Sequence, residues 1–412
     1  MRFSDLDGKR VALWGAGRET NAFRTQLERR LPGATISDVI DDNTLAEEAR
    51  AALTRADVLV RSPGVSVYKP LIQEAIAAGT TVATPTGLWL AERGGEHVIG
   101  VTGTKGKSTT ATVIAHLIRA TGVPVELAGN IGRPVIELLD MDAGVGGGNQ
   151  RTWVVCELSS YQIADLTVGP EVAVLTNLSR EHTDWHGGEE RYRADKLRIF
   201  ELPCVRVAVM PPEAGWPVLF EPEEIPLRGV HNARNVTAAI TAIEAAGLPL
   251  PPLPQALAGL TALPHRLQTV HTDAGGSEWI DDSISTTPES TIAALEAFAD
   301  RPLVLIAGGS DRDQDYDRLG LTLAARTAAT QLILLPATGS AIAGAAASHG
   351  YAEDRMSTAG DMREATRLAV ALTQPGGVVL LSPAAPSFSQ YANFEQRGDD
   401  FAACAKSVAL RS

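Results

Sequence analysis

The fold of this 412-residue chain is decided by one short stretch, Val101-Thr102-Gly103-Thr104-Lys105-Gly106-Lys107-Ser108. It completes an apolar run that begins at His97 and reads as a strand, and it leads into a segment with the apolar spacing of a helix. A Gly-rich turn between a strand and a helix is the setting of a phosphate-binding loop, because N–H groups of the turn and the helix N-terminus point at phosphate oxygens. Lys107 is expected to reach the terminal phosphates and Ser108 a Mg²⁺ ion. The usual pattern has Gly where Val101 stands, but strand, turn and helix in this order predict a nucleotide site.

Short apolar strands alternate with helical segments along the chain, which indicates parallel sheets covered by helices on both faces. The expected strands are Arg10–Trp14, Asp57–Val60, His97–Thr102, Thr152–Cys156, Val172–Thr176, Leu303–Ala307, Leu332–Leu335 and Val378–Leu381. Polar Glu92–Glu96 and Pro-rich Leu248–Pro254 mark changes of segment. The predicted fold class is α/β with three consecutive domains, at residues 1–93, 94–263 and 264–412.

Composition narrows the class of partners. The formal net charge is −13, which disfavours nucleic acid and anionic membrane surfaces as partners. Three widely spaced cysteines, Cys156, Cys204 and Cys404, form neither a disulfide framework nor a CxxC metal knuckle. No signal peptide is recognisable, and no apolar run approaches the ~18 residues that a membrane span requires. We therefore expect a cytoplasmic protein with no membrane insertion.

A second glycine-rich stretch, Gly15-Ala16-Gly17-Arg18-Glu19-Thr20, is a weak dinucleotide signal. Thr20 occupies the third Gly position of that fingerprint, so NAD binding is not expected.

The phosphate loop and the motifs that follow it resemble those of the Mur ligase family over the whole length of the chain. Thr102–Ser108 is similar to the family's variant loop, which also lacks the first Gly, although Lys105 stands where the family usually has Asn. The other motifs come in the family's order: Gly129–Gly132 (GNIG), Glu157–Gln162 (ELSSYQ), Thr176–Leu178 with His182, His231-Asn232 with Asn235, Pro264–Arg266 (PHR), Leu381–Ala384 (LSPA) and Phe394–Gly398 (FEQRG).

The resemblance implies an ATP-dependent ligase that activates a carboxylate as an acyl phosphate before an amine attacks it. Positive charge must then gather between two anionic substrates. Lys107, Glu157, His182, Lys196 and Arg266 would carry the catalysis. Two Mg²⁺ ions are expected on Ser108, Glu157, His182 and Lys196, the lysine as a carbamate, because a bare ammonium would repel the metal. As isolated residues, Glu157 could be an ordinary strand end and Lys196 a surface lysine.

Two binding sites follow from the same resemblance. ATP would be bound by Gly103, Thr104, Lys105, Gly106, Lys107, Ser108, Thr109, Asn235, Arg266 and Asp282. A UDP-linked substrate, UDP-N-acetylmuramoyl-L-alanine, would be bound by a Rossmann-like first domain at Arg18, Asp38, Ser62 and Gly64, which are expected on loops at strand ends, together with Asn130 and His182. The third domain would also be Rossmann-like. Arg266 would reach the γ-phosphate only after domain closure.

The added amino acid is expected to be glutamate, whose two carboxylates need cationic or hydroxyl partners. Arg312, Thr286, Ser387 and the backbone N–H of Phe394 match the family's glutamate contacts. Ile284 stands where the usual D-glutamate enzymes have a lysine. With Val11–Gly15, Thr183–Gly187 and Pro386–Phe388, this substitution resembles a minority branch that adds L-glutamate and relies on a separate epimerase.

Three alternatives stay open at this point. The chain could add D-glutamate by the same reaction. It could be a ligase of the folylpolyglutamate synthase type, which a UDP-binding first domain disfavours. It could also be a non-catalytic paralogue or cell-wall scaffold, which the joint presence of Lys107, Glu157, His182, Lys196 and Arg266 disfavours.

Overall fold

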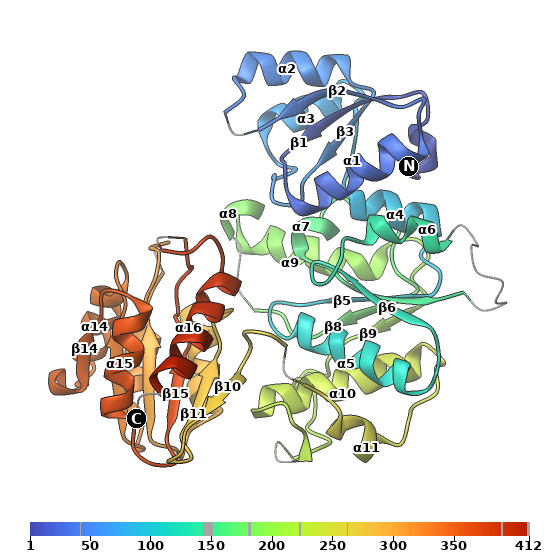
Figure 1. Ribbon diagram of the computed structural model, residues 1–412. Helices are drawn as coiled ribbons and strands as arrows, with labels where there is room; N and C mark the ends of the chain where they lie inside the picture. The colour runs from blue at the N-terminus through green and yellow to red at the C-terminus, as the bar shows by residue number, and fades with distance from the viewer. Residues whose placement is uncertain are drawn as a thin grey trace. The chain divides into compact units, whose positions relative to one another are not determined.

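The structure, a computed structural model, describes residues 1–41, 43–142, 151–179, 183–221, 224–261, 263–312, 314–388 and 390–409. Three sheets follow one another along the chain, and helices cover their faces (Figure 1). They form two compact units. The first unit comprises Met1–Leu219 and Asn232–Gly259, and the second comprises Phe220–His231 and Leu260–Ser412.

The N-terminal sheet is parallel and has the strand order β2-β1-β3-β4. Its strands are β1 (Arg10–Trp14), β2 (Thr35–Ile40), β3 (Val58–Arg61) and β4 (Thr81–Ala83), and its helices are α1 (Arg18–Arg30), α2 (Ala46–Arg55), α3 (Pro70–Ala77) and α4 (Pro85–Arg93). The last helix has a complete set of end signals. The Thr84 hydroxyl accepts a hydrogen bond from the Gly87 N–H, Pro85 occupies the first turn, and Gly94 ends the helix in the left-handed conformation.

The central sheet is also parallel, with the order β6-β7-β5-β8-β9. Its strands are β5 (Val98–Thr102), β6 (Val125–Gly129), β7 (Trp153–Glu157), β8 (Val172–Leu175) and β9 (Val207–Val209). Its helices are α5 (Lys107–Ala120), α6 (Leu139–Asp142), α7 (Ser160–Ile163), α8 (Thr183–His186), α9 (Glu189–Leu197), α10 (Val230–Ala245) and α11 (Leu253–Ala258). All residues of β5, β7 and β8 are buried, as expected for parallel strands covered on both faces.

The C-terminal sheet has the order β10-β11-β15-β12-β13-β14, and only the edge strand β10 runs antiparallel to its neighbour. Its strands are β10 (Gln268–Thr272), β11 (Glu278–Asp281), β12 (Leu303–Ala307), β13 (Thr330–Leu334), β14 (Met356–Thr358) and β15 (Val378–Leu381). Its helices are α12 (Pro288–Glu296), α13 (Asp317–Ala325), α14 (Gly339–Ser348), α15 (Met362–Leu372) and α16 (Phe394–Ala409).

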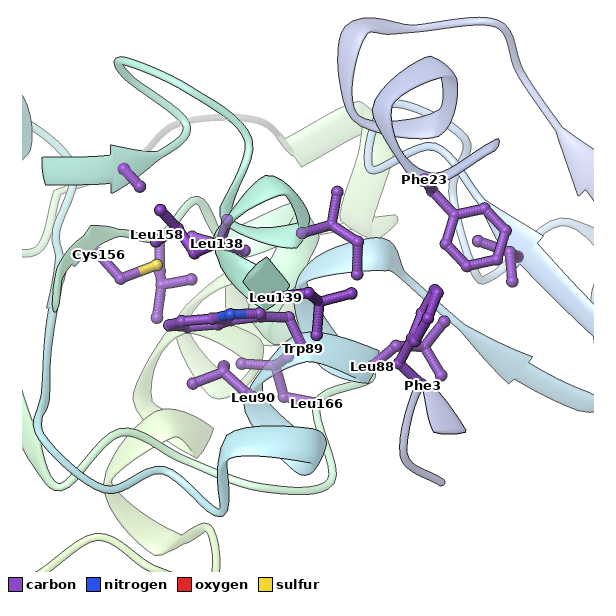
Figure 2. Close-up of a cluster of buried hydrophobic side chains, with 14 of the residues drawn as sticks. Phe3, Phe23, Leu88, Trp89, Leu90, Leu138, Leu139, Cys156, Leu158 and Leu166 are labelled. Atoms are coloured by element: carbon purple, nitrogen blue, oxygen red, sulfur yellow. The ribbon is translucent and has the colours of Figure 1, made fainter. Parts of the chain in front are cut away.

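One hydrophobic cluster joins the N-terminal and central parts of the first unit. Phe3 and Phe23 belong to the N-terminal part, Leu138 and Leu166 to the central part, and Trp89 on α4 is fully buried in the same cluster (Figure 2). The cores of the second unit contain only residues of that unit. Burial of a large aromatic side chain stabilises by roughly 1.5–3 kcal/mol, so this shared core holds the first two sheets together.

The structure confirms the predicted α/β fold class with three sheet-based domains, whereas the boundaries at residues 93 and 263 stay predictions. Three expected strands, Arg10–Trp14, Leu303–Ala307 and Val378–Leu381, have the predicted ends, and the others differ by one or two residues. The sequence analysis did not identify β2, β4, β6, β9, β10, β11 and β14. In the part of the chain that the structure describes, no helix combines the length and the apolarity needed to cross a membrane.

Candidate functional site

The phosphate loop lies between β5 and α5, as the sequence predicts. Gly103 and Gly106 have φ of 149° and 79°, and a Cβ at Gly103 would run into the Thr176 hydroxyl. The backbone of Lys105 is fixed from both sides, because its N–H donates to Asn177 Oδ1 at 2.9 Å and its carbonyl accepts from Asn177 Nδ2 at 2.9 Å. Loop glycines and an N-terminal helix end therefore form the backbone cradle that phosphate binding requires.

The polar side chains that follow the loop lie at the start of α5. Lys107 and Ser108 begin α5, and Lys107 Nζ donates to the Thr104 carbonyl at 2.9 Å. Ser108 and Thr109 are buried, and the Thr109 hydroxyl is among the described buried groups with no hydrogen-bond partner. A polar group in that state is one that a ligand can satisfy.

Glu157 is the last residue of β7 and is 1% exposed. Its Oε1 accepts from Asn130 Nδ2 at 3.0 Å, whereas Oε2 is buried and, among the described residues, has no partner. A buried carboxylate oxygen without a partner is costly unless a cation compensates it. The Glu157 carboxylate therefore fits a bound cation such as Mg²⁺, and the Ser108 hydroxyl at the start of α5 would be a further oxygen ligand.

Lys196 lies on α9 and is 2% exposed. Its Nζ donates to the Gly103 carbonyl of the phosphate loop at 2.8 Å. On the same helix, the hydroxyl of buried Tyr192 lies 2.8 Å from Thr104 Oγ1. The structure thus brings Lys196 to the phosphate loop and excludes the alternative that it is a surface lysine.

Asn235 reaches the same loop from α10. A Cβ at Gly106 would run into the Asn235 side chain, which donates to Asn232 Oδ1 at 3.1 Å. Asn235 lies inside this helix, and its contact with ATP stays a prediction.

In the N-terminal part, Arg18 is the first residue of α1 and donates to the carbonyls of Gly132 at 2.9 Å and Asn130 at 3.0 Å. Since the Asn130 side chain in turn contacts Glu157, Arg18 is linked to the candidate metal ligand through a single residue. Arg18 was expected on a loop, and its place at a helix start is a correction.

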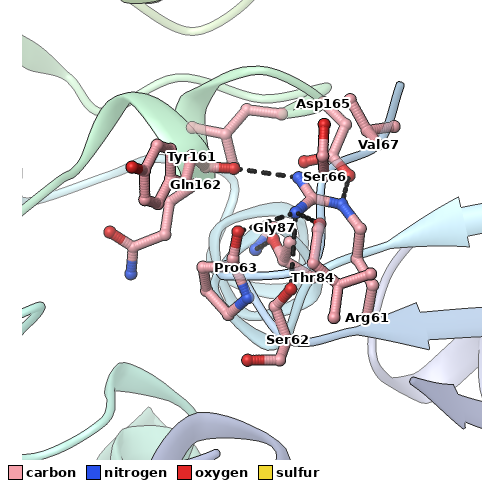
Figure 3. Close-up of polar contacts among 12 residues, drawn as sticks. Arg61, Ser62, Pro63, Ser66, Val67, Thr84, Gly87, Tyr161, Gln162 and Asp165 are labelled. Carbon is pink, nitrogen blue, oxygen red and sulfur yellow. Dashed lines mark hydrogen bonds and ion pairs between the residues drawn. The ribbon is translucent and has the colours of Figure 1, made fainter. Parts of the chain in front are cut away.

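Ser62 and Gly64 follow β3, at the carboxyl end of the sheet, as expected. Their loop is held by Arg61, which is fully buried and donates to Asp165 Oδ2 at 2.8 Å, the Tyr161 carbonyl at 2.9 Å and the Val65 carbonyl at 2.9 Å (Figure 3). A buried guanidinium that donates from all three nitrogens rigidifies its surroundings.

Asp38 differs from expectation. It lies inside β2 rather than on a loop at the strand end, and it forms an ion pair with Arg55. It lines a cavity of ≈ 520 Å³ between α1 and β2 together with Arg24 and Glu28. Asp38 is therefore part of the sheet, because the strand continues to Ile40, two residues beyond it.

In the second unit, three loops meet at the carboxyl ends of the adjacent strands β11, β15 and β12. They are Asp282–Thr287, Ser382–Phe388 and Gly308–Arg312. Backbone hydrogen bonds connect them, from Ala384 N to Ser285 O at 3.0 Å and from Ser310 N to Pro386 O at 2.8 Å. Ligands bind at this edge of open parallel sheets.

The expected glutamate contacts all belong to these loops or to the start of α16. Thr286, Ser387 and Arg312 lie on the three loops, one on each, and Phe394 is the first residue of α16, where N–H groups have no partner within the helix. Arg312 is exposed, and its guanidinium lies 5.3 Å from the Phe388 ring centroid. The structure thus gathers one cation, two hydroxyls and a helix N-terminus.

A residue that the sequence analysis missed holds this arrangement. Arg397 on α16 is 1% exposed and donates to Ser283 Oγ at 2.9 Å, to the Ser283 carbonyl at 2.9 Å and to the Ala385 carbonyl at 3.0 Å. Burial lowers its pKa to about 10, which leaves it charged at neutral pH. It joins two of the three loops, and the motif Phe394–Gly398 was the sequence signal that could have identified it.

Asp282 is buried in the second unit. Its Oδ1 accepts from Leu267 N at 3.2 Å and its Oδ2 from Ser382 Oγ at 2.8 Å. Burial raises its pKa to about 6, against the lowering effect of these hydrogen bonds and of Arg266. Both carboxylate oxygens of Asp282 already accept hydrogen bonds within the second unit, so its contact with the ATP ribose stays a prediction.

Two other expected site residues are Arg266 and His182. Arg266 belongs to the second unit, next to His265 and Leu267, which both have positive φ. His182 lies outside the described residues. Within the described ranges, no three His, Cys, Asp or Glu side chains gather as a metal site.

Comparisons with known proteins agree with this geometry. Residues 101–213 match the Mur ligase middle domain, and residues 265–385 match the Mur ligase glutamate ligase domain. The chain belongs to the Mur ligase family and is an ATP-dependent ligase that forms amide bonds.

Two curated relatives cover nearly the whole chain. The UDP-N-acetylmuramoyl-L-alanine–L-glutamate ligase of Xanthomonas euvesicatoria pv. vesicatoria is 38% identical, over 98% of this chain and 96% of that protein. The enzyme of the same name from Micromonospora sp. is 36% identical, over 99% of both chains. Among solved structures, MurF ligase from Thermotoga maritima in complex with ADP has a TM-score of 0.61 and 14% identity, over 100% of this chain and 97% of that one. At this level of identity, the similarity shows a shared fold.

Proposed function

We propose that the protein joins L-glutamate to UDP-N-acetylmuramoyl-L-alanine, with ATP as the energy source, in peptidoglycan precursor synthesis. The observation that carries this proposal is the meeting of Arg312, Thr286 and Ser387 at the carboxyl ends of three adjacent strands, with Ile284 rather than a lysine on the first loop. Relatives named for the L-glutamate reaction, 36–38% identical to the chain, support it.

In the proposed reaction, the phosphate loop binds the ATP phosphates and Lys107 neutralises their charge. The acceptor carboxylate takes the γ-phosphoryl group, which makes it an acyl phosphate. The glutamate amine then attacks the acyl carbon, and phosphate leaves. Binding and orientation carry most of the rate enhancement in such transfers.

Magnesium, when bound, supplies the charge that offsets repulsion between the anionic substrates. Glu157 and Ser108 would hold one ion, and Lys196, as its carbamate, would hold a second together with His182. Since Lys196 Nζ already lies 2.8 Å from the Gly103 carbonyl, a carbamate on it would be next to the phosphates.

The UDP-linked substrate would bind along the N-terminal sheet edge, at Ser62, Gly64 and Arg18, and reach Asn130. Its acceptor carboxylate would then lie near Glu157, which Asn130 contacts. An epimerase would have to act on the product before D-glutamate-containing peptidoglycan could be made.

The test is product formation from UDP-N-acetylmuramoyl-L-alanine, ATP and either enantiomer of glutamate, with the product hydrolysed and its glutamate resolved by chiral chromatography. We expect product containing L-glutamate. Product formed only with D-glutamate would leave the ligase activity intact and refute the L-glutamate assignment.

A further inference from the structure

Helix α9 carries two adjacent buried side chains that point to different partners. Lys196 donates to the Gly103 carbonyl at 2.8 Å, while Asp195 accepts from the Tyr68 hydroxyl at 2.7 and 2.8 Å. Tyr68 belongs to the N-terminal part of the first unit, just before α3. Asp195 and Lys196 are consecutive residues of α9, so a contact that holds α9 at Asp195 also holds the backbone from which the Lys196 side chain extends.

His186 is a second hydrogen-bond donor to Asp195. His186 Nδ1 lies 2.6 Å from Asp195 Oδ2, and its Nε2 lies 3.0 Å from Ser160 Oγ. His186 is fully buried and Asp195 is 7% exposed, so these bonds act in a low-dielectric interior. Ser160 begins α7, directly after the β7 segment that ends in Glu157. The network thus connects the segments that carry both proposed catalytic residues.

The loop that precedes Tyr68 is attached to the central part at several points. Trp185 Nε1 donates to the Gly64 carbonyl at 3.0 Å, and Ser66 Oγ donates to the Trp185 carbonyl at 2.8 Å. The Arg61 guanidinium lies 5.5 Å from the Trp185 ring centroid while it bonds Tyr161 and other partners (Figure 3). Tyr68 is therefore presented to Asp195 by a rigid loop, the one that also carries Ser62 and Gly64.

We propose that Tyr68, acting through Asp195, is a positioning residue that holds Lys196 against the phosphate loop. His186 supports Asp195 from the other side. The proposal rests on the proposed function only in giving Lys196 a part in the reaction. Burial and the hydrogen bond to Asp195 raise the pKa of Tyr68, which keeps its hydroxyl protonated as a donor.

The experiment compares Tyr68→Phe with wild type in the full-length protein. The matched control is Tyr351→Phe, which removes a hydroxyl that donates to the Thr330 carbonyl at 2.7 Å in the second unit. We expect kcat for ADP release to fall about 10- to 100-fold in Tyr68→Phe, the range found for partners that orient catalytic groups. KM for ATP and calorimetric binding of UDP-N-acetylmuramoyl-L-alanine without ATP or metal should stay within about twofold of wild type. Unchanged kcat, or a loss confined to substrate binding, overturns the proposal.

A double-mutant comparison separates positioning from a general structural role. Tyr68→Phe should have almost no further effect in a Lys196→Ala background assayed with added acetate, because the residue that it positions is absent. Equal fold losses with and without Lys196 would show that Tyr68 acts independently and would refute the proposal. Asp195→Asn should behave like Tyr68→Phe in both backgrounds. Since the assay compares ADP release among variants, all given the enantiomer that the wild type uses, its outcome does not depend on the L-glutamate assignment.

Discussion

The two compact units organise their polar side chains differently. In the first unit, hydrogen bonds from Arg18, Arg61 and Tyr68 cross from the N-terminal part to the central part, which also share one hydrophobic cluster. In the second unit, one buried arginine, Arg397, ties two loops of a single sheet. The first arrangement connects the loop that carries Ser62 and Gly64 to the central part, whereas the second connects loops within one sheet. Under the proposed function, a residue such as Ile284 would then influence the choice of amino acid without altering the phosphate loop.

The largest expected effect is in the first unit. Lys107→Ala should lower kcat for ADP release by at least about 10²–10³-fold, because it removes a preorganised positive charge from a site of developing negative charge. Lys406→Ala, which changes an exposed lysine of α16, is the control. Near-normal turnover in a folded Lys107→Ala protein would remove the phosphate-loop assignment.

The role of Lys196 can be tested by chemical rescue. Lys196→Ala should lower kcat for ADP release by about 10²-fold or more, because Lys196 is proposed to hold a metal ion. Formate or acetate should restore part of this rate by replacing the carbamate oxygens. An amine that rescues where carboxylates do not would show that Lys196 acts as a cation instead.

In the second unit, Arg312→Ala should raise KM for glutamate about 10- to 150-fold, since a charged hydrogen bond contributes about 1.5–3 kcal/mol. KM for ATP should not change, because Arg312 is not among the expected ATP contacts. Arg318→Ala, on an exposed position of α13, is the matched control. An equal rise in KM for ATP would contradict the assignment of Arg312 to the glutamate site.

A smaller, pH-dependent effect is expected at Asp282. Burial raises its pKa to about 6 in the folded protein from an ordinary value of 3.8, so the native state binds a proton more tightly than the unfolded state. Its contribution to stability is thus full below pH 3.8 and is lost as pH rises through about 6. Relative to wild type, Asp282→Asn should gain on the order of 2 kcal/mol in unfolding free energy between pH 4 and pH 7.5. Urea unfolding at both pH values measures this difference, and a pH-independent difference would contradict the assignment.

The sequence was sufficient to predict the parts of the site that are local. The phosphate loop needs only a strand, two glycines and a helix start in order, and these could be predicted without a structure. The contacts of Tyr68 with Asp195 and of Arg397 with Ser283 could not, because they join residues 127 and 114 positions apart. The place of Asp38 inside a strand could not be predicted either, because Thr35–Ile40 alternates polar and apolar residues only weakly and forms a strand by pairing with β1.

The most direct test of the account is the ratio of kcat/KM for L-glutamate to that for D-glutamate, measured on the purified full-length protein. Mirror-image substrates cannot place an amine and two carboxylates on the same three contacts, and loss of one charged hydrogen bond costs about 1.5–3 kcal/mol. We therefore expect kcat/KM to be about 10 to 150 times higher for L-glutamate than for D-glutamate. A ratio below one would contradict the central claim that the loops around Arg312 and Ile284 select L-glutamate.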